Sequence, residues 1–222
     1  MKGLTRFAAV LAALTLSANT FAQVNDWANT ARYYEANKAV TASPKAVFMG
    51  DSITDGWAAQ DAGFFTSHNY AGRGISGQTT CQMLVRFRQD VINLKPKYVV
   101  ILAGTNDIAQ NIGPISHEAI VNNIISMCEL AKAHKIKVVI CSILPVYQYV
   151  WRPEIEKPAD QIMEINAQLR EYAKANKFTY LDYHSAMKDD RNGLPAKLST
   201  DGCHPTKEGY AIMEEMVTKV LK

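Results

Sequence analysis

The sequence has no marked excess of charge of either sign and no run of basic residues. Its 222 residues include 24 lysines and arginines against 21 aspartates and glutamates. A protein that follows a nucleic-acid backbone needs a row of positive side chains to neutralise the phosphates. We therefore expect no nucleic-acid partner. Apolar runs of the roughly 20 residues that cross a bilayer are also missing, so we expect no stable insertion into a membrane.

Cysteine is scarce, and its spacing fits neither a disulfide-rich scaffold nor a zinc cluster. The four cysteines are Cys81, Cys128, Cys141 and Cys203. Cys128 falls in a helical pattern and Cys141 ends an apolar run, and buried free thiols are common at such positions. The sequence leaves open whether any of them pair.

The first 22 residues have the pattern of a secretory signal peptide. Lys2 and Arg6 precede an apolar run over residues 7–16, and the small residue Ala22 supplies a cleavage site before Gln23. We expect cleavage there and export to the periplasm or the extracellular space. Residues 23–222 contain no internal repeat, and we expect them to form a single domain with a sizeable core.

Continuous apolar runs alternate with helical patterns along the rest of the chain. The runs cover residues 46–49, 98–103, 136–141 and 178–181, with a weaker strand near 68–71. The helical patterns cover residues 79–94, 116–134, 159–176 and 206–221. This alternation predicts an α/β protein, a three-layer α/β/α sandwich with about five parallel strands. A further helix is expected over residues 25–37, outside the sheet.

Four polar, glycine-bearing segments follow the predicted strands or the last connection. They are Gly50-Asp51-Ser52-Ile53, Gly72 to Gly77, Gly104-Thr105-Asn106-Asp107, and Asp201 to Pro205. In an open parallel sheet these segments meet at the carboxyl edge, where ligands bind. We therefore expect the functional site at that edge.

Ser52 lies between a strand and a predicted helix, so its hydroxyl would face the positive end of a helix dipole. Asp51 and Ser52 are also ordinary helix-capping residues, and on their own they would indicate no more than a cap. Asp201 and His204, three positions apart, change that interpretation. Their spacing lets the carboxylate orient one imidazole nitrogen while the other faces Ser52, the arrangement a general base requires.

Ester hydrolysis also needs fixed hydrogen-bond donors for the oxyanion of the tetrahedral intermediate. Gly77 can turn its backbone N–H into the site without a side chain in the way. Asn106 directly follows the strongest strand and offers a side-chain amide. Each segment alone would fit an ordinary loop, and the combination predicts an oxyanion hole.

The four segments together resemble the blocks of the SGNH hydrolases, also called the GDSL esterase/lipase family. The similarity spans the mature chain, with Ile53 in place of the family's leucine. It implies a flavodoxin-like fold, an acyl-enzyme mechanism and no metal or organic cofactor. It also implies that Ser52 is the nucleophile, His204 the base and Asp201 the orienting carboxylate.

The same resemblance assigns the oxyanion hole to the N–H groups of Ser52 and Gly77 and to the side chain of Asn106. We interpret the neighbouring motif residues as supports that hold the loops: Asp51, Thr105 and Asp107. The Gly-x-Ser-x-Gly elbow of the α/β-hydrolases does not surround this serine, which disfavours that fold.

The loop over residues 144–153 is dense in aromatic side chains and follows the fourth strand. We expect Tyr147, Trp151 and Arg152 to line the acyl or alcohol pocket, although such a cluster can also be a packed surface loop. Flat aromatic faces suit sugar rings, so an acetyl ester of a carbohydrate is the first choice of substrate. A lysophospholipase or phospholipid acetylhydrolase remains an alternative, and the oligomeric state is open.

The sequence gives less support to two other classes of function. A metallophosphoesterase could use Asp51, Asp55, Asn106, Asp107 and His204 as ligands, but the sequence lacks the Asp-x-His and Gly-His-x-His motifs of such sites. A sugar-binding module without catalysis is disfavoured because no member of the Ser-His-Asp set is missing.

Overall fold

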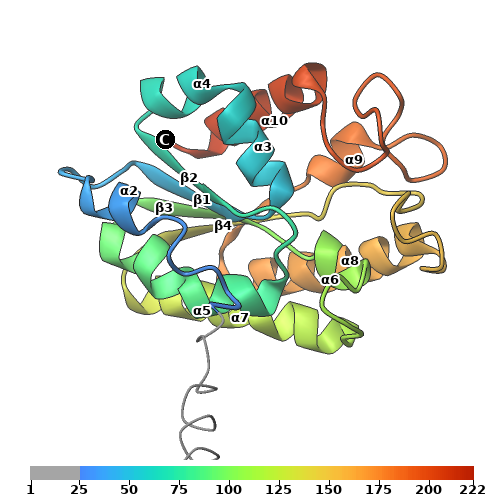
Figure 1. The fold of residues 1–222 in the computed structure, drawn as a ribbon, viewed down its shortest axis with the longest axis horizontal. Helices are drawn as coiled ribbons and strands as arrows, with labels where there is room; N and C mark the ends of the chain where they lie inside the picture. Colours follow the sequence, from blue (N-terminus) through green and yellow to red (C-terminus); the bar gives the residue numbers. More distant parts are fainter. Residues whose placement is uncertain (1–25) are drawn as a thin grey trace, which may run out of the picture.

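A parallel sheet of five strands forms the middle layer (Figure 1), as the sequence predicts. The computed structural model describes residues 26–222, so the expected signal peptide lies outside the described residues. The strand order is β2-β1-β3-β4-β5, and every neighbouring pair is parallel. The strands are β1 (Ala46–Gly50), β2 (Tyr70–Gly74), β3 (Tyr98–Leu102), β4 (Lys137–Cys141) and β5 (Thr179–Leu181).

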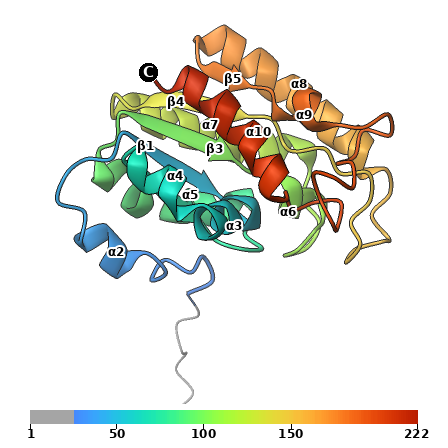
Figure 2. The same ribbon diagram turned by 90° about the horizontal axis from the view of Figure 1, so that it is seen from above.

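Helices cover both faces of this sheet, which gives three layers (Figures 1 and 2). One face carries α3 (Ser52–Gln60), α4 (Ala62–Ser67), α9 (Tyr183–Met187) and α10 (Lys207–Val220). The other carries α5 (Thr80–Asp90), α7 (His117–Ala133) and α8 (Pro158–Asn176). Three short elements complete the described chain: α2 (Tyr34–Lys38), a 3₁₀ turn over Ile92–Leu94, and α6 (Thr105–Ile108).

The apolar strands are continuous because both of their faces are covered. In β1, Val47 and Met49 point into the core beneath α5 and α7, whereas Phe48 points to the opposite core. All five residues of β1 and of β3 are buried. Such strands give an unbroken apolar run in the sequence rather than an alternating one.

The register of the central strands brings the candidate loops together. Gly50 at the end of β1 pairs with Gly74 at the end of β2 and with Leu102 at the end of β3. The loops that carry Ser52, Gly77 and Asn106 therefore leave three adjacent strands at one edge. Gly74 must be a glycine, because a Cβ there would lie 2.2 Å from the backbone nitrogen of Asp55.

The N-terminal helix is shorter than the sequence pattern predicts. Residues 26–33 form turns, and α2 contains only Tyr34–Lys38. The Asp26 carboxylate accepts hydrogen bonds from the Thr30 hydroxyl and the Ala31 N–H, and Asn29 adopts a left-handed φ of 50°. These local bonds compete with a helix and favour a turn. The predicted helix over 25–37 is wrong in this part.

All four cysteines are free thiols, and three of them are buried. Burial raises the pKa of Cys128 to about 12, so this thiol stays protonated at neutral pH. Among the helices of residues 26–222, none is both long enough and apolar enough to span a bilayer.

Candidate active site

Ser52, His204 and Asp201 form a connected chain of hydrogen bonds at the carboxyl edge of the sheet. Ser52 is the first residue of α3, directly after β1. Its Oγ lies 2.8 Å from Nε2 of His204, and Nδ1 of the same ring lies 2.6 Å from Oδ2 of Asp201. The structure thus brings the three predicted residues together although Ser52 and His204 are 152 positions apart.

The turn before α10 fixes the Asp201 carboxylate. Its Oδ1 accepts the backbone N–H groups of Cys203 at 2.9 Å and of His204 at 2.8 Å, and the Ser199 hydroxyl at 3.0 Å. Burial disfavours the charged form, but the bonds from His204 and Cys203 outweigh it and lower the pKa of Asp201 to about 2.

An ionised Asp201 decides which nitrogen of His204 carries the proton. The carboxylate can only accept, so Nδ1 of the neutral ring donates to it. Nε2 is then left with its lone pair toward the Ser52 hydroxyl. This is the tautomer that can take a proton from the serine.

The two predicted oxyanion donors outside Ser52 lie in the neighbouring loops. Gly77 is in the loop between β2 and α5 with a φ of +79°, a conformation that favours glycine, and a Cβ there would contact no atom within 4 Å. Asn106 is the second residue of α6, and its Nδ2 donates to the Gln78 carbonyl at 3.0 Å. An amide nitrogen has two hydrogens, so one remains for a ligand.

Sequence reasoning missed Asn111, which fixes the Asn106 amide. Nδ2 of Asn111 donates to Oδ1 of Asn106 at 2.8 Å and lies 3.4 Å from the Gly77 carbonyl oxygen. Asn111 follows α6 in an irregular turn, and nothing in its sequence position distinguishes it from an ordinary loop asparagine. Only the folded arrangement shows that it contacts both oxyanion loops.

The three residues expected to support the loops all make such contacts. Asp51 caps α3 by accepting the Ile53 N–H at 2.9 Å. Asp107 accepts from the backbone N–H and the hydroxyl of Thr80 at 2.9 and 2.6 Å, which ties α6 to the start of α5. The Thr105 hydroxyl lies 2.9 Å from the Tyr149 hydroxyl. These contacts hold the loops that carry Ser52 and Asn106 in place.

Burial makes the two supporting carboxyl groups weak acids. It raises the pKa of Asp51 to about 7, and Asp107 nearby adds to the increase. Burial likewise raises the pKa of Asp107 to about 6, against the bonds from Thr80. Near neutral pH, Asp51 and Asp107 together therefore carry less negative charge than two solvent-exposed carboxylates would.

A surface depression of about 410 Å³ opens beside Ser52 and His204. Most of the residues that line it are polar or small, among them Asp55, Gly56 and Ser76, and Tyr210 adds an aromatic ring. Trp151 borders the same site: its ring centre lies 6.1 Å from that of His204, the side chain is 38% exposed, and its Nε1 is 3.4 Å from Oδ1 of Asn111.

The other two residues expected to contact substrate lie elsewhere. Tyr147 lines a separate depression of about 350 Å³, where the Arg191 guanidinium lies 5.1 Å from its ring centre. Arg152 donates to the Gln110 carbonyl at 3.0 Å and pairs with Glu154 at 2.6 Å, so it braces the loop next to Asn111. Of the three, only Trp151 is placed beside a member of the Ser-His-Asp set, the His204 ring.

The alternative set of metal ligands does not converge. Across residues 26–222, no three His, Cys, Asp or Glu side chains form a group that could hold a metal ion. Asp51 and Asp107 turn to backbone N–H groups and to Thr80, and both ring nitrogens of His204 are engaged by Ser52 and Asp201.

Comparison with known proteins agrees with this geometry. Residues 48–212 match the model of the GDSL-like Lipase/Acylhydrolase family. The chain belongs to this family. It is accordingly a serine-dependent carboxylic ester hydrolase of the GDSL type, which confirms the family, fold class and enzyme class expected from the sequence.

Two solved structures from Bacteroides are similar to this chain over most of their length. A protein from Bacteroides fragilis assigned as an acylhydrolase shares 45% identity with a TM-score of 0.86, over 88% of this chain and 96% of that one. A GDSL-like lipase from Bacteroides thetaiotaomicron shares 46% identity with a TM-score of 0.85, over 87% and 97% of the two chains.

More distant relatives share the fold or part of the sequence. An acetylxylan esterase from Geobacillus stearothermophilus has 20% identity and a TM-score of 0.65 over 81% of this chain and 94% of its own, which shows a common fold. This chain spans only 32% of the length of the Bacillus subtilis lipoprotein YqeF and 39% of that of an Escherichia coli N-acylneuraminate cytidylyltransferase.

Proposed function

We propose that this GDSL hydrolase cleaves short-chain acyl esters, acetyl esters of carbohydrates in particular, through a covalent acyl-enzyme on Ser52. The observation that carries the proposal is the hydrogen-bonded chain from Ser52 Oγ through His204 to Asp201. A serine hydroxyl is a weak nucleophile, and an adjacent base that a carboxylate orients is what activates it.

In the first half of the reaction, His204 Nε2 takes the Ser52 proton while Oγ attacks the carbonyl carbon of the ester. The oxyanion of the tetrahedral intermediate accepts hydrogen bonds from the N–H groups of Ser52 and Gly77 and from Asn106 Nδ2. The bond from carbon to the alcohol oxygen then breaks, and His204 gives its proton to the departing alcohol. The acyl group stays on Ser52.

Water completes the cycle with the roles reversed. His204 removes a proton from the water, whose oxygen attacks the acyl carbon. The second tetrahedral intermediate uses the same donors, and its collapse releases the carboxylic acid and returns the proton to Ser52. Asp201 stabilises the imidazolium in both halves and keeps the ring in position.

The lining of the depression supports a short acyl group. A long acyl chain needs a continuous apolar wall, whereas here Asp55, Gln60 and Ser76 interrupt it. Trp151 supplies an exposed flat ring at the edge of the site, which suits the apolar face of a sugar. The acetylxylan esterase from Geobacillus stearothermophilus shows that a protein of this fold acts on an acetylated carbohydrate.

We also propose that the protein is exported. The support is the pattern of the first 22 residues, together with the fact that one curated relative is a lipoprotein.

A substrate panel tests the proposal. Acetylated xylo-oligosaccharides, nitrophenyl esters of increasing chain length and a lysophospholipid are assayed with the wild-type protein and with Ser52→Ala. We expect the highest kcat/KM for acetyl esters, a fall with acyl length, and no turnover by the variant. Turnover of the lysophospholipid above that of every acetyl ester would contradict the substrate, and an active Ser52→Ala would contradict the mechanism.

A further inference from the structure

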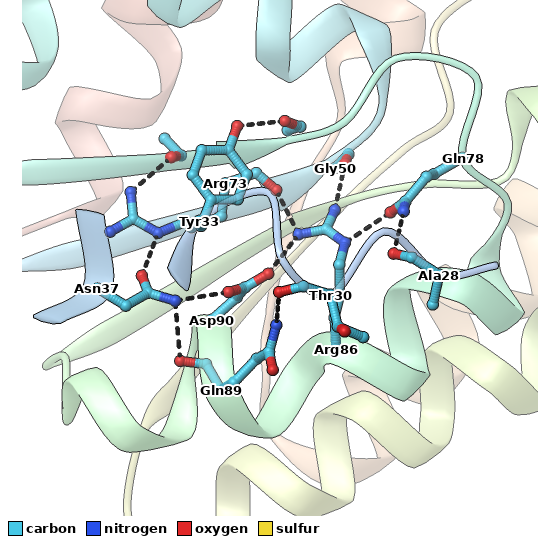
Figure 3. Close-up of polar contacts among 12 residues, drawn as sticks. Ala28, Thr30, Tyr33, Asn37, Gly50, Arg73, Gln78, Arg86, Gln89 and Asp90 are labelled. Atoms are coloured by element: carbon cyan, nitrogen blue, oxygen red, sulfur yellow. Dashed lines mark hydrogen bonds and ion pairs between the residues drawn. The ribbon is translucent and has the colours of Figure 1, made fainter. Parts of the chain in front are cut away.

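The N-terminal segment, defined here as residues 26–38, is held by glutamine side chains of α5 and of the loop before it, two of which, Gln78 and Gln89, are labelled in Figure 3. The amide of Gln78 donates to the Ala28 carbonyl at 2.6 Å, and that of Gln82 to the Trp27 carbonyl at 2.8 Å. Gln89 donates in the same way to the Thr30 carbonyl. Side-chain amides thus satisfy the carbonyls of a segment that has no helix of its own there.

Gln78 connects this segment to the oxyanion loops. It directly follows Gly77, and its backbone carbonyl accepts the hydrogen bond from Asn106 Nδ2. Its side chain lies between the Ala28 carbonyl and the guanidinium of Arg86, whose Nε donates to Oε1 at 2.5 Å. A displacement of Gln78 would therefore move both the Gly77 N–H and the Asn106 amide.

Arg86 is completely buried and connects the ends of β1 and β2 with the loop that carries Gln78 (Figure 3). It donates to the Gly50 carbonyl at 2.9 Å, two residues before Ser52, and to the Arg73 carbonyl at 2.9 Å. Asp90 pairs with it at 3.0 Å. A buried cation that makes four hydrogen bonds holds its partners firmly, because each lost bond would leave a buried polar group unpaired at a high cost in free energy.

The N-terminal segment closes this network at its other end. Asn37 donates to Oδ1 of Asp90 at 2.7 Å and accepts from Nε of Arg73 at 2.8 Å. Tyr33 donates from its hydroxyl to the Gly74 carbonyl, at the end of β2 (Figure 3). The segment therefore contacts both the strand end that leads to Gly77 and the carboxylate that balances Arg86.

We propose that residues 26–38 are a positioning element of the oxyanion hole, acting through Gln78 and Arg86, so that loosening them lowers kcat and leaves KM nearly unchanged. This inference rests on the proposed roles of Ser52, Gly77 and Asn106. Its physical reason is that a donor aimed at the oxyanion contributes most in the transition state, and a displacement of about 1 Å can reduce the rate by about a hundredfold.

Glutamine-to-glutamate substitutions break these contacts selectively. Gln78→Glu keeps an acceptor for Arg86 but has no N–H for the Ala28 carbonyl. Gln82→Glu likewise keeps the acceptor that takes the Thr79 N–H at 3.0 Å and loses the bond to Trp27. The Gln82→Glu/Gln89→Glu double variant therefore loosens the segment without changing Gln78, the residue next to Gly77. Gln168→Glu, exposed on α8, is the control for added charge.

The experiment compares Gln78→Glu, the Gln82→Glu/Gln89→Glu double variant and the control in the full chain. Hydrogen exchange of residues 26–38 reports whether the segment is freed. Steady-state kinetics on nitrophenyl acetate separate kcat from KM. The inhibition constant of an alkylboronic acid, which forms a tetrahedral adduct with a serine, reports the oxyanion hole.

We expect faster exchange in the segment, a kcat about ten- to a hundredfold lower, a boronate inhibition constant raised by a similar factor, and a KM within about twofold. Unchanged kcat and boronate binding in both variants, with the segment freed, would overturn the proposal. The proposal would also be overturned if residues 26–38 stayed protected from exchange in both variants. If both variants failed to fold, the segment would be an element needed for folding, and its role in positioning the oxyanion hole would be rejected.

Ser52→Ala, measured in parallel, separates this inference from the proposed function. Turnover by that variant would refute the serine mechanism whatever the glutamine variants do. Its inactivity together with unaltered glutamine variants would refute the role of the segment alone.

Discussion

Asn111 donates a hydrogen bond of 2.8 Å to the side-chain oxygen of Asn106, and this contact determines which way the Asn106 amide faces. With its oxygen held by Asn111, the Asn106 nitrogen faces the Gln78 carbonyl and keeps one hydrogen for a ligand. Without Asn111, the amide could rotate and present an oxygen to the oxyanion. We infer that Asn111 is a positioning residue of the oxyanion hole.

Replacement of Asn111 by aspartate tests this inference. A carboxylate at this position cannot donate to the Asn106 oxygen, so we expect kcat on nitrophenyl acetate to fall about ten- to a hundredfold with little change in KM. Asn93→Asp, at an exposed position before β3, is the matched control and should keep the wild-type kcat. A kcat for Asn111→Asp equal to that of the control would show that the contact does not matter.

Trp151 offers a prediction about the alcohol side of the substrate. Because its exposed ring borders His204, removing it should weaken the binding of a sugar ester more than that of a small aryl ester. For Trp151→Ala we expect KM to rise about tenfold on an acetylated xylo-oligosaccharide and to change less than about threefold on nitrophenyl acetate. Tyr147→Ala, in the separate depression, serves as the comparison, and equal effects of the two changes would contradict the assignment.

The lowered pKa of Asp201 predicts a loss of stability in acid. The folded carboxyl group titrates near pH 2, below the 3.8 of an unfolded aspartate, so its contribution is complete above about pH 4 and disappears as the pH falls toward 2. Urea unfolding at pH 5 and pH 2.5 should therefore show a larger decrease for the wild type than for Asp201→Asn. Asp190→Asn, an exposed loop residue, should behave like the wild type. Equal decreases in all three proteins would refute the prediction.

The pKa of Asp51 makes stability depend on pH in the opposite direction. Its pKa is raised by burial from 3.8 to about 7, so the folded state holds the proton more tightly, and its stability falls as the pH rises from about 4 through 7. An asparagine at this position would keep the acceptor for the Ile53 N–H and carry no charge. We expect Asp51→Asn to raise the free energy of unfolding by up to about 4 kcal/mol at pH 8, since each unit of pKa shift corresponds to about 1.4 kcal/mol, and to have little effect at pH 4. A variant less stable than the wild type at pH 8 would contradict the burial argument.

Much of the fold could be predicted because the strands are covered on both sides. The apolar runs over residues 98–103 and 136–141 predict the strands that form as β3 and β4, and a polar cap, Ser116, marks the start of the helix between them. The four motif segments then had to meet at one edge, since parallel strands share the direction in which they end.

The parts that could not be predicted depend on partners distant in the sequence. Residues 26–33 have no helix because turns, Gln78 and the glutamines of α5 take their polar groups, and no local pattern indicates this. Asn111 acquires its place only through Asn106 and Gly77. Tyr147 and Trp151 are four positions apart in one loop, yet the course of that loop places Tyr147 in a separate depression and Trp151 beside His204.

Covalent labelling of the serine is the decisive measurement. The wild-type protein is treated with a serine-directed phosphonate while turnover of an acetyl ester is followed, and peptide mass spectrometry locates the adduct. We predict one phosphonyl group per chain, attached to Ser52, loss of activity in proportion to labelling, and no adduct in Ser52→Ala. Full activity after stoichiometric labelling of Ser52, or hydrolysis by Ser52→Ala at the wild-type rate, would contradict the acyl-enzyme mechanism.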